Sequence, residues 1–140
     1  MLFKNGYIYH FQPCDVAYPA KNKFVICISK SKSKFYLVNS FENNDGTPNG
    51  RPHSYEKDFA FKFQKKRINC LKHGSYININ RLEFISNDSI VKSKIDEKES
   101  IPQDIWLSLK QFVRDFDSDK PRCRISQETK DIMANITKDK

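Results

Sequence analysis

The sequence predicts a mainly β protein with α additions, built as a small, strongly bent barrel with helices near its C-terminal end. Two observations lead to this fold class. Short runs rich in β-branched and aromatic residues occupy the first two thirds of the chain, and the apolar spacing becomes helical after residue 100. The 140 residues fit one domain with one modest core. We expect the barrel and one amphipathic helix over residues 1–119, and a basic tail with a short helix over 120–140.

The N-terminal part of the chain has the pattern of several strands. Residues 1–12 alternate loosely, as in an edge strand or an arm, and residues 14–19 have the composition of a short strand ended by Pro19. Residues 23–29 and 34–40 are dense in apolar side chains, which is typical of buried strands. The Ser-Lys connection between them suits a β-hairpin, although it lacks the Gly typical of the tightest turns.

A long break separates these strands from the next group. Residues 42–53 are rich in Asn, Asp, Gly and Pro, and so long a loop is uncommon unless it is mobile or functional. Residues 58–64 place three Phe side chains on one face, which is strand periodicity. Further short strands are expected at 75–79, 81–86 and 89–94.

The helical part begins at a sequence that resembles a capping box. Ser100 is the expected N-cap and Gln103 the residue that completes the box. Apolar residues then recur at helical spacing over 101–116, with polar residues on the other side, so we expect one amphipathic helix that packs on the core. A short second helix is expected from Ser126.

The positive charge is concentrated in one part of the chain. The formal net charge is +8, and residues 1–81 contain 14 Lys and Arg against 5 Asp and Glu. Such a localised excess favours a polyanionic partner, of which nucleic acid is the commonest. The alternative is a lysine-rich surface that only keeps the protein soluble. Gly is scarce, with four residues, so a glycine-rich phosphate loop is not expected.

Composition also bounds the compartment and the cofactors. The first ten residues are too polar for a secretory signal, and no apolar run is long enough to span a membrane. We therefore expect a cytoplasmic protein whose four cysteines, Cys123 among them, are reduced. The pairs His10–Cys14 and Cys70–His73 leave a zinc site open as an alternative. Their spacing is not standard, so no metal and no cofactor are expected.

The order of these short motifs resembles a known family. The segments DVAYP, AKNKFVICIS and KFYLVNS, followed by CLKHGSYININRLEFIS, are similar to the MazF/PemK-like toxins, in particular to a PemK-related branch. The resemblance covers roughly residues 14–116. It implies an SH3-like barrel, often a homodimer, that cleaves single-stranded RNA without a metal and is neutralised by a partner antitoxin.

The resemblance also implies positions for a site. The family's charge-stabilising Arg, in an Arg-Pro pair, corresponds to Lys23, which is followed here by Phe24. The Thr or Ser that assists this Arg corresponds to Ser40, and Cys14 stands where the family has Gly. Lysine supplies the positive charge but not the bidentate geometry of arginine.

Metal-free RNA cleavage needs a base for the 2′-OH, a cation at the phosphate and an acid for the leaving oxygen. Histidine can act as acid or base near neutral pH. The candidate catalytic residues are Lys23, Ser40, His53 and His73. The candidate nucleic-acid-binding residues are Lys21, Lys30, Lys32, Lys34, Arg51, Lys65, Lys66, Arg67 and Tyr76.

Each candidate residue also has an ordinary structural role open to it, such as a solvated lysine, a turn histidine or a strand-end serine. Two other functions therefore stay open beside the endoribonuclease. One is a barrel that binds nucleic acid without cleaving it. The other is a protein-interaction module whose basic face meets an acidic partner.

Overall fold

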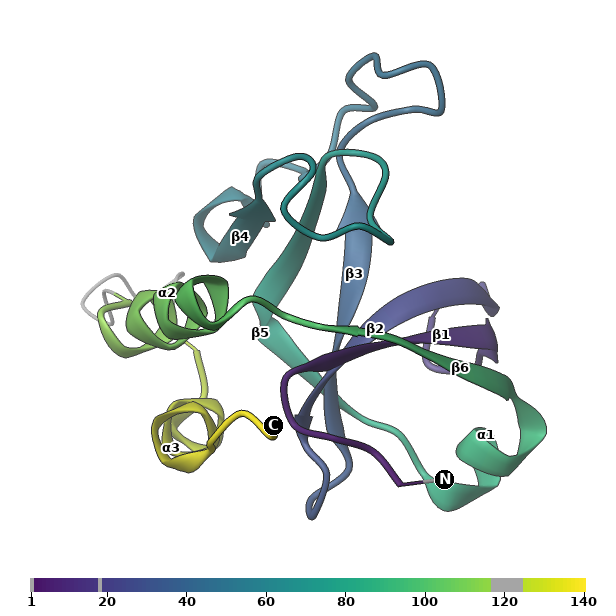
Figure 1. Cartoon of the computed structure of the whole chain (residues 1–140). Helices are drawn as coiled ribbons and strands as arrows, with labels where there is room; N and C mark the ends of the chain where they lie inside the picture. Colours follow the sequence, from purple (N-terminus) through teal and green to yellow (C-terminus); the bar gives the residue numbers. More distant parts are fainter. Residues whose placement is uncertain (1, 18, 117–124) are drawn as a thin grey trace.

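The computed structural model describes residues 2–17, 19–116 and 125–140, and its centre is one antiparallel sheet (Figure 1). Its six strands are β1 (Tyr7–Cys14), β2 (Lys21–Ser29), β3 (Lys34–Ser40), β4 (Ala60–Phe63), β5 (Ser75–Phe84) and β6 (Lys94–Ser100). The helices are α1 (Asn87–Lys92), α2 (Gln103–Arg114) and α3 (Gln127–Asn135), with a 3-10 turn, η1, at Lys57–Phe59. The predicted mainly β class with helical additions is confirmed.

The sheet is open. Its strand order is β4-β5-β3-β2-β1-β6, and within the described residues the edge strands β4 and β6 do not pair with each other. These strands therefore do not form the closed barrel that the sequence predicts. Aromatic side chains of α2 and of the residues that follow it lie beside β4: the rings of Phe61 and Phe112 are 5.6 Å apart, and those of Phe59 and Phe116 are 5.2 Å apart.

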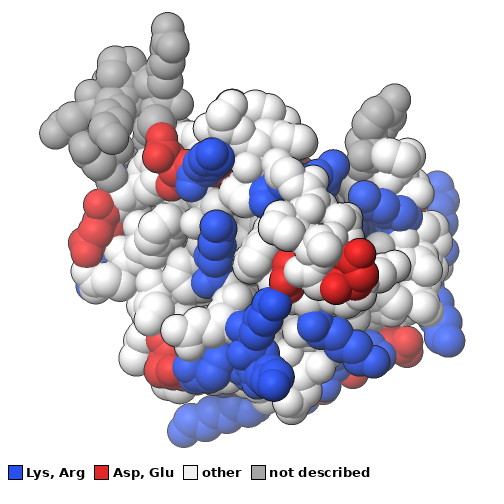
Figure 2. Space-filling model, turned by 90° about the horizontal axis from the view of Figure 1, so that it is seen from above, with Lys and Arg blue, Asp and Glu red and all other residues white. Residues whose placement is uncertain are grey.

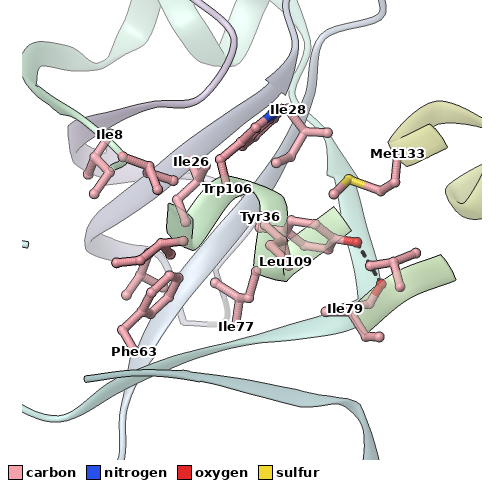
Figure 3. Packing of buried hydrophobic residues seen from close by; sticks show 14 of the residues in the cluster. Ile8, Ile26, Ile28, Tyr36, Phe63, Ile77, Ile79, Trp106, Leu109 and Met133 are labelled. Atoms are coloured by element: carbon pink, nitrogen blue, oxygen red, sulfur yellow. Dashed lines mark hydrogen bonds between the residues drawn. The ribbon is translucent and has the colours of Figure 1, made fainter. Parts of the chain in front are cut away.

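The central strands bury side chains on both faces, because successive residues of a strand point to opposite sides. On one face Ile26, Tyr36 and Ile77 pack under α2 and α3 in the larger cluster (Figure 3). On the other face a smaller cluster forms around Val25 and Phe35. Tyr36 keeps its polar end satisfied within the larger cluster, since its hydroxyl donates to the carbonyl of Ile79 at 2.8 Å.

Helix α2 packs as its apolar stripe predicts. Its buried residues are Ile105, Trp106, Leu109 and Val113, and Trp106 is only 1% exposed. The expected capping box is wrong, because Pro102 is the N-cap and makes no side-chain capping bond. Helix α3 begins as expected at Ser126, whose side chain accepts a hydrogen bond from the amide of Thr129.

Four strand predictions are wrong. Residues 1–12 contain an interior strand, since β1 pairs with both β2 and β6, and the chain turns after Cys14 instead of starting a new strand. Residues 75–84 form one strand, not two. Residues 87–92 form α1, with Ser86 as its side-chain cap, and the charged strand β6 follows. The expectations that fall on residues 18 and 117–124, including Cys123, lie outside the described residues.

Strand β6 was missed because it has few apolar residues. Its sequence KIDEKES has no clear apolar alternation, and the strand pairs only with β1. Charged side chains are common on edge strands, where they discourage pairing with other chains. Tertiary pairing, and not local propensity, therefore makes this segment a strand.

We predict that the core under α2 is sensitive to truncation at one face of the helix only. Leu109→Ala should lower the free energy of unfolding by about 2–5 kcal/mol, because Leu109 is fully buried. Leu107→Ala, at a side chain that is 54% exposed, should change it by about 0.5 kcal/mol or less. Urea denaturation of both variants tests this, and equal losses would contradict the packing of α2.

Candidate functional site

A polar pocket of about 210 Å³ lies on the face of the sheet that carries the smaller cluster. It occupies the end of β3 away from the β2–β3 hairpin, below the long loop at the top of Figure 1. Strands β2, β3 and β5 form its floor, and residues 51–56 of the loop form one side. Figure 2 views the molecule from this loop end and shows several Lys and Arg side chains with a few acidic ones among them.

The floor is set by the sheet register. Asn39 of β3 is paired with Tyr76 of β5, so both side chains lie on the same face, and Asn78 follows two residues later on that face. Lys23 of β2 reaches the same floor, since its Nζ donates a hydrogen bond to Asn39 Oδ1 at 2.8 Å. The smaller apolar cluster thus ends where these polar side chains begin.

Lys23 is a charged side chain that lies partly buried in the pocket. Burial lowers the pKa of its ammonium group to about 8, and the positive charges of Lys21 and Arg51 act in the same direction. The ammonium is therefore charged at neutral pH and loses its proton at mildly alkaline pH. Such a cation, held by one neutral amide and no carboxylate, has free capacity for an anionic ligand.

The loop that forms the side of the pocket is held at its base by Glu42. This carboxylate is 7% exposed, pairs with Lys65 at 2.6 Å and accepts a hydrogen bond from the backbone amide of Gly74. These two bonds lower its pKa, with that from Lys65 the larger cause. Asn49 closes the loop, because its side chain donates to the carbonyl of Ser40 at 2.8 Å.

The rim of the pocket is exposed and carries aromatic rings and charges. The rings of His53 and Tyr55 are stacked with centroids 5.7 Å apart, and Tyr55 is 75% exposed. Arg81 of β5 is exposed beside Glu83, at 3.8 Å. Glu56 lies near enough to Tyr76 to raise its pKa, although burial is the larger cause.

The structure brings five of the candidate residues together at this pocket: Lys21, Lys23, Arg51, His53 and Tyr76. It does not bring Ser40 and His73 there. The Ser40 hydroxyl donates to the Glu42 carbonyl at 2.7 Å, and the carbonyl of His73 accepts from Ser75 Oγ at 2.8 Å. Both residues belong to the turns that hold the loop, and neither lines the pocket that contains Lys23.

The lysines of the β2–β3 hairpin lie at the opposite end of β3 from the pocket (Figure 1). Lys30 pairs with Asp139 at 2.6 Å, and Lys34 lies 3.5 Å from Glu128 of α3. Lys32 is exposed, and Ser33, at φ 54°, supplies the left-handed turn conformation that Gly usually provides. The hairpin lysines therefore interact with the C-terminal segment and do not extend the pocket.

The other predicted binding residues are also dispersed. Lys65 is engaged by Glu42, and Arg67 forms two hydrogen bonds, at 2.7 and 2.8 Å, with the carboxylate of Asp104. Lys66 is exposed on the same connection, with φ 67°. These residues line neither the pocket nor one continuous groove with it.

Sequence reasoning missed the neutral and acidic polar members of the site and one cation: Asn39, Asn78, Glu56, Glu83 and Arg81. One available signal was the alternation in SYININR, where Tyr76 and Asn78 are the polar side of a strand whose other side is isoleucine. The side on which the loop residues meet this strand is not encoded in any local pattern.

The zinc alternative is not supported by the positions of the residues it needs. His10 packs against Phe24, with ring centroids 4.7 Å apart, whereas Cys14 lies in the smaller cluster and Cys70 against the larger one. Across the described ranges, no group of three or more His, Cys, Asp and Glu side chains is arranged to hold a metal ion.

The comparisons with known proteins give no family. No protein-family model, no curated protein and no solved structure matches this chain. Within the part of the chain that the structure describes, no helix has both the length and the apolar character needed to cross a membrane.

We predict a pKa of about 8 for Lys23, measurable by NMR titration of its side-chain Cε resonance. Lys21→Met should raise this pKa only in part, because it removes a like charge and leaves the larger effect of burial. A Lys23 that titrates like a solvated lysine, near 10.4, would contradict the buried position.

We also predict that Glu42 holds the long loop. Glu42→Ala should speed hydrogen exchange at the Gly74 amide and in residues 41–56, because the acceptor of Gly74 and the partner of Lys65 are both lost. Glu56→Ala, in the same loop but outside these contacts, is the control. Unchanged exchange in Glu42→Ala would show that the loop is held by other contacts.

Proposed function

We propose that the pocket binds single-stranded RNA and cleaves it without a metal, with the 2′-OH of the RNA as the nucleophile. The observation that carries this proposal is the convergence of Lys21, Lys23 and Arg51 with the stacked rings of His53 and Tyr55. Cations bind the phosphates, and exposed aromatic rings stack on unpaired bases. RNA is the substrate that supplies both groups together with its own nucleophile.

The reaction places the scissile phosphate at the mouth of the pocket. The 2′-oxygen forms a bond to phosphorus and the bond from phosphorus to the 5′-oxygen breaks, which leaves a 2′,3′-cyclic phosphate and a 5′-hydroxyl. Lys23 and Arg51 stabilise the negative charge of the pentacoordinate phosphorus. His53 and Glu56, on the same loop, take the proton of the 2′-OH and return one to the leaving oxygen.

A second function is favoured by one specific observation. The Ser40 hydroxyl is bound within a turn and His73 does not line the pocket, so among the described residues the exposed His53 is the only lining histidine. A pocket with cations and stacking rings but a weak acid–base pair would bind RNA and leave it intact. Cleavage assays and binding assays on the same RNA separate the two functions.

The remaining expectations form part of the same proposal. A MazF/PemK-like toxin would act in the cytoplasm as a homodimer with a partner antitoxin. Supporting this are the resemblance of residues 14–116 and the place of Lys23 in the pocket. The open sheet and the engagement of the Ser40 hydroxyl by the Glu42 carbonyl count against a close relationship.

We predict that Lys23→Met and Arg51→Met each reduce cleavage of a fluorescent single-stranded RNA by about 100-fold, as when one stabilising donor is removed from an oxyanion site. Lys32→Met, at the distant hairpin, is the matched control and should keep full activity. Reactions contain EDTA, and the product ends are identified by mass spectrometry.

Three results distinguish the possibilities. Cyclic phosphate ends in the wild type, with loss in the two pocket variants, support cleavage. Salt-sensitive binding without cleavage supports the second function. Equal activity of Lys32→Met and Lys23→Met, or no RNA binding at low salt, would overturn the assignment of the pocket.

A further inference from the structure

The deepest groups of the pocket are two polar side chains whose donors have no partner in the described protein. Tyr76 is 1% exposed and Asn78 is 8% exposed, and both line the pocket. Neither the Tyr76 hydroxyl nor the Asn78 Nδ2 is hydrogen-bonded to another described residue. Among these residues no fully buried side-chain nitrogen or oxygen lacks a partner. The two donors must therefore open into the pocket, where a ligand can reach them.

The hydrogen bonds that do exist fix which end of each amide faces the pocket. Asn78 Oδ1 accepts from the backbone amide of Asn80 at 3.0 Å, and Asn39 Oδ1 accepts from Lys23 Nζ at 2.8 Å. Each asparagine therefore presents its NH₂ group as a donor. Together with the Tyr76 hydroxyl, the floor offers neutral donors to a ligand that carries acceptors.

The cations of the pocket lie mostly at its rim, and Lys23 on the floor, held by Asn39, is the exception. Lys21, Arg51 and Arg81 are exposed at the rim, whereas Ala17 is buried and Leu37 is partly buried. Exposed cations suit the phosphates of a strand that continues over the surface. Apolar walls and the neutral donors of Tyr76 and Asn78 suit an uncharged, flat ring, beside which the ammonium of Lys23 can face the adjoining phosphate.

From this arrangement, and resting on the proposed function, we infer that the pocket accepts one unpaired uracil, whose two carbonyl oxygens are read by Asn78, Asn39 and Tyr76. Uracil has carbonyl oxygens at both positions that flank its N–H, whereas cytosine has an amino group at one of them and adenine has no carbonyl. Guanine has a single carbonyl, so it offers these donors one such acceptor where uracil offers two.

Binding of RNA analogues that cannot be cleaved tests the inference. Four 2′-fluoro heptamers, which lack the attacking hydroxyl, differ only in one central base within an adenine background. Fluorescence anisotropy with the wild-type protein should give the tightest binding for uracil. The preference over cytosine should be about 3- to 10-fold, the scale of one hydrogen bond with a neutral partner.

Substitutions of the floor residues should change the preference for uracil over cytosine more than the overall affinity for the heptamers. Asn78→Leu and Tyr76→Phe should each reduce the uracil-to-cytosine ratio toward one. Asn78→Asp, which replaces a donor by an acceptor, should shift the preference toward cytosine. Asn22→Leu, on β2 and outside the pocket lining, is the matched control and should keep the wild-type ratio. Thermal melting checks that each variant is folded. Because Asn78 and Tyr76 are changed separately, the inference can still be tested if one of the two variants does not fold.

The outcomes separate this inference from the proposed function. Salt-sensitive binding of all four heptamers with equal affinity, or a preference for a purine or cytosine, would overturn the uracil pocket and leave RNA binding intact. A uracil preference that survives in both Asn78→Leu and Tyr76→Phe would also overturn it. No binding of any heptamer at low salt would remove the proposed function together with the inference.

Discussion

The alternation of side chains on β2, β3 and β5 between two covered faces is the constraint on which the other features depend. Each of these strands supplies one face to the cluster under α2 and α3, so every second residue must be apolar. The opposite face is apolar only as far as the smaller cluster extends. Beyond it, the same register places Lys23, Asn39 and Tyr76 side by side, and the polar pocket follows from the sheet itself.

A buried carboxylate extends this frame to the loop. Glu42 connects the start of the loop to Lys65 and to the turn at Gly74. These two residues lie near the two ends of the connection between β4 and β5. The residues that this arrangement presents, Arg51 and His53, could otherwise sample many positions in so long a loop. One side of the pocket is thus the rigid sheet and another is the anchored loop. This arrangement suits a site that binds a flexible strand of nucleic acid.

The sequence allowed the buried strands and the amphipathic helix to be predicted, because 23–29, 34–40 and the stripe of α2 have clear apolar periods. Lys23 was assigned through the resemblance to a family with an Arg at this position, and Tyr76 as a ring that can stack on a base; the structure places both in the pocket. The sequence could not show that Ser40 and His73 lie outside the pocket lining, because the turns that contain them are joined through Glu42 and Gly74, which are 32 residues apart. The charged strand β6 was missed because only its pairing with β1 makes it a strand.

The pairing of the hairpin with the C-terminal segment has a consequence for the order of folding. Lys30 and Asp139 are 109 residues apart, and the backbone amide of Asp139 also donates to the carbonyl of Asn5. During synthesis the hairpin can form early, but these contacts must wait until residue 139 has left the ribosome. The hairpin and the segment at Asn5 therefore lack these contacts until the chain has been made as far as residue 139.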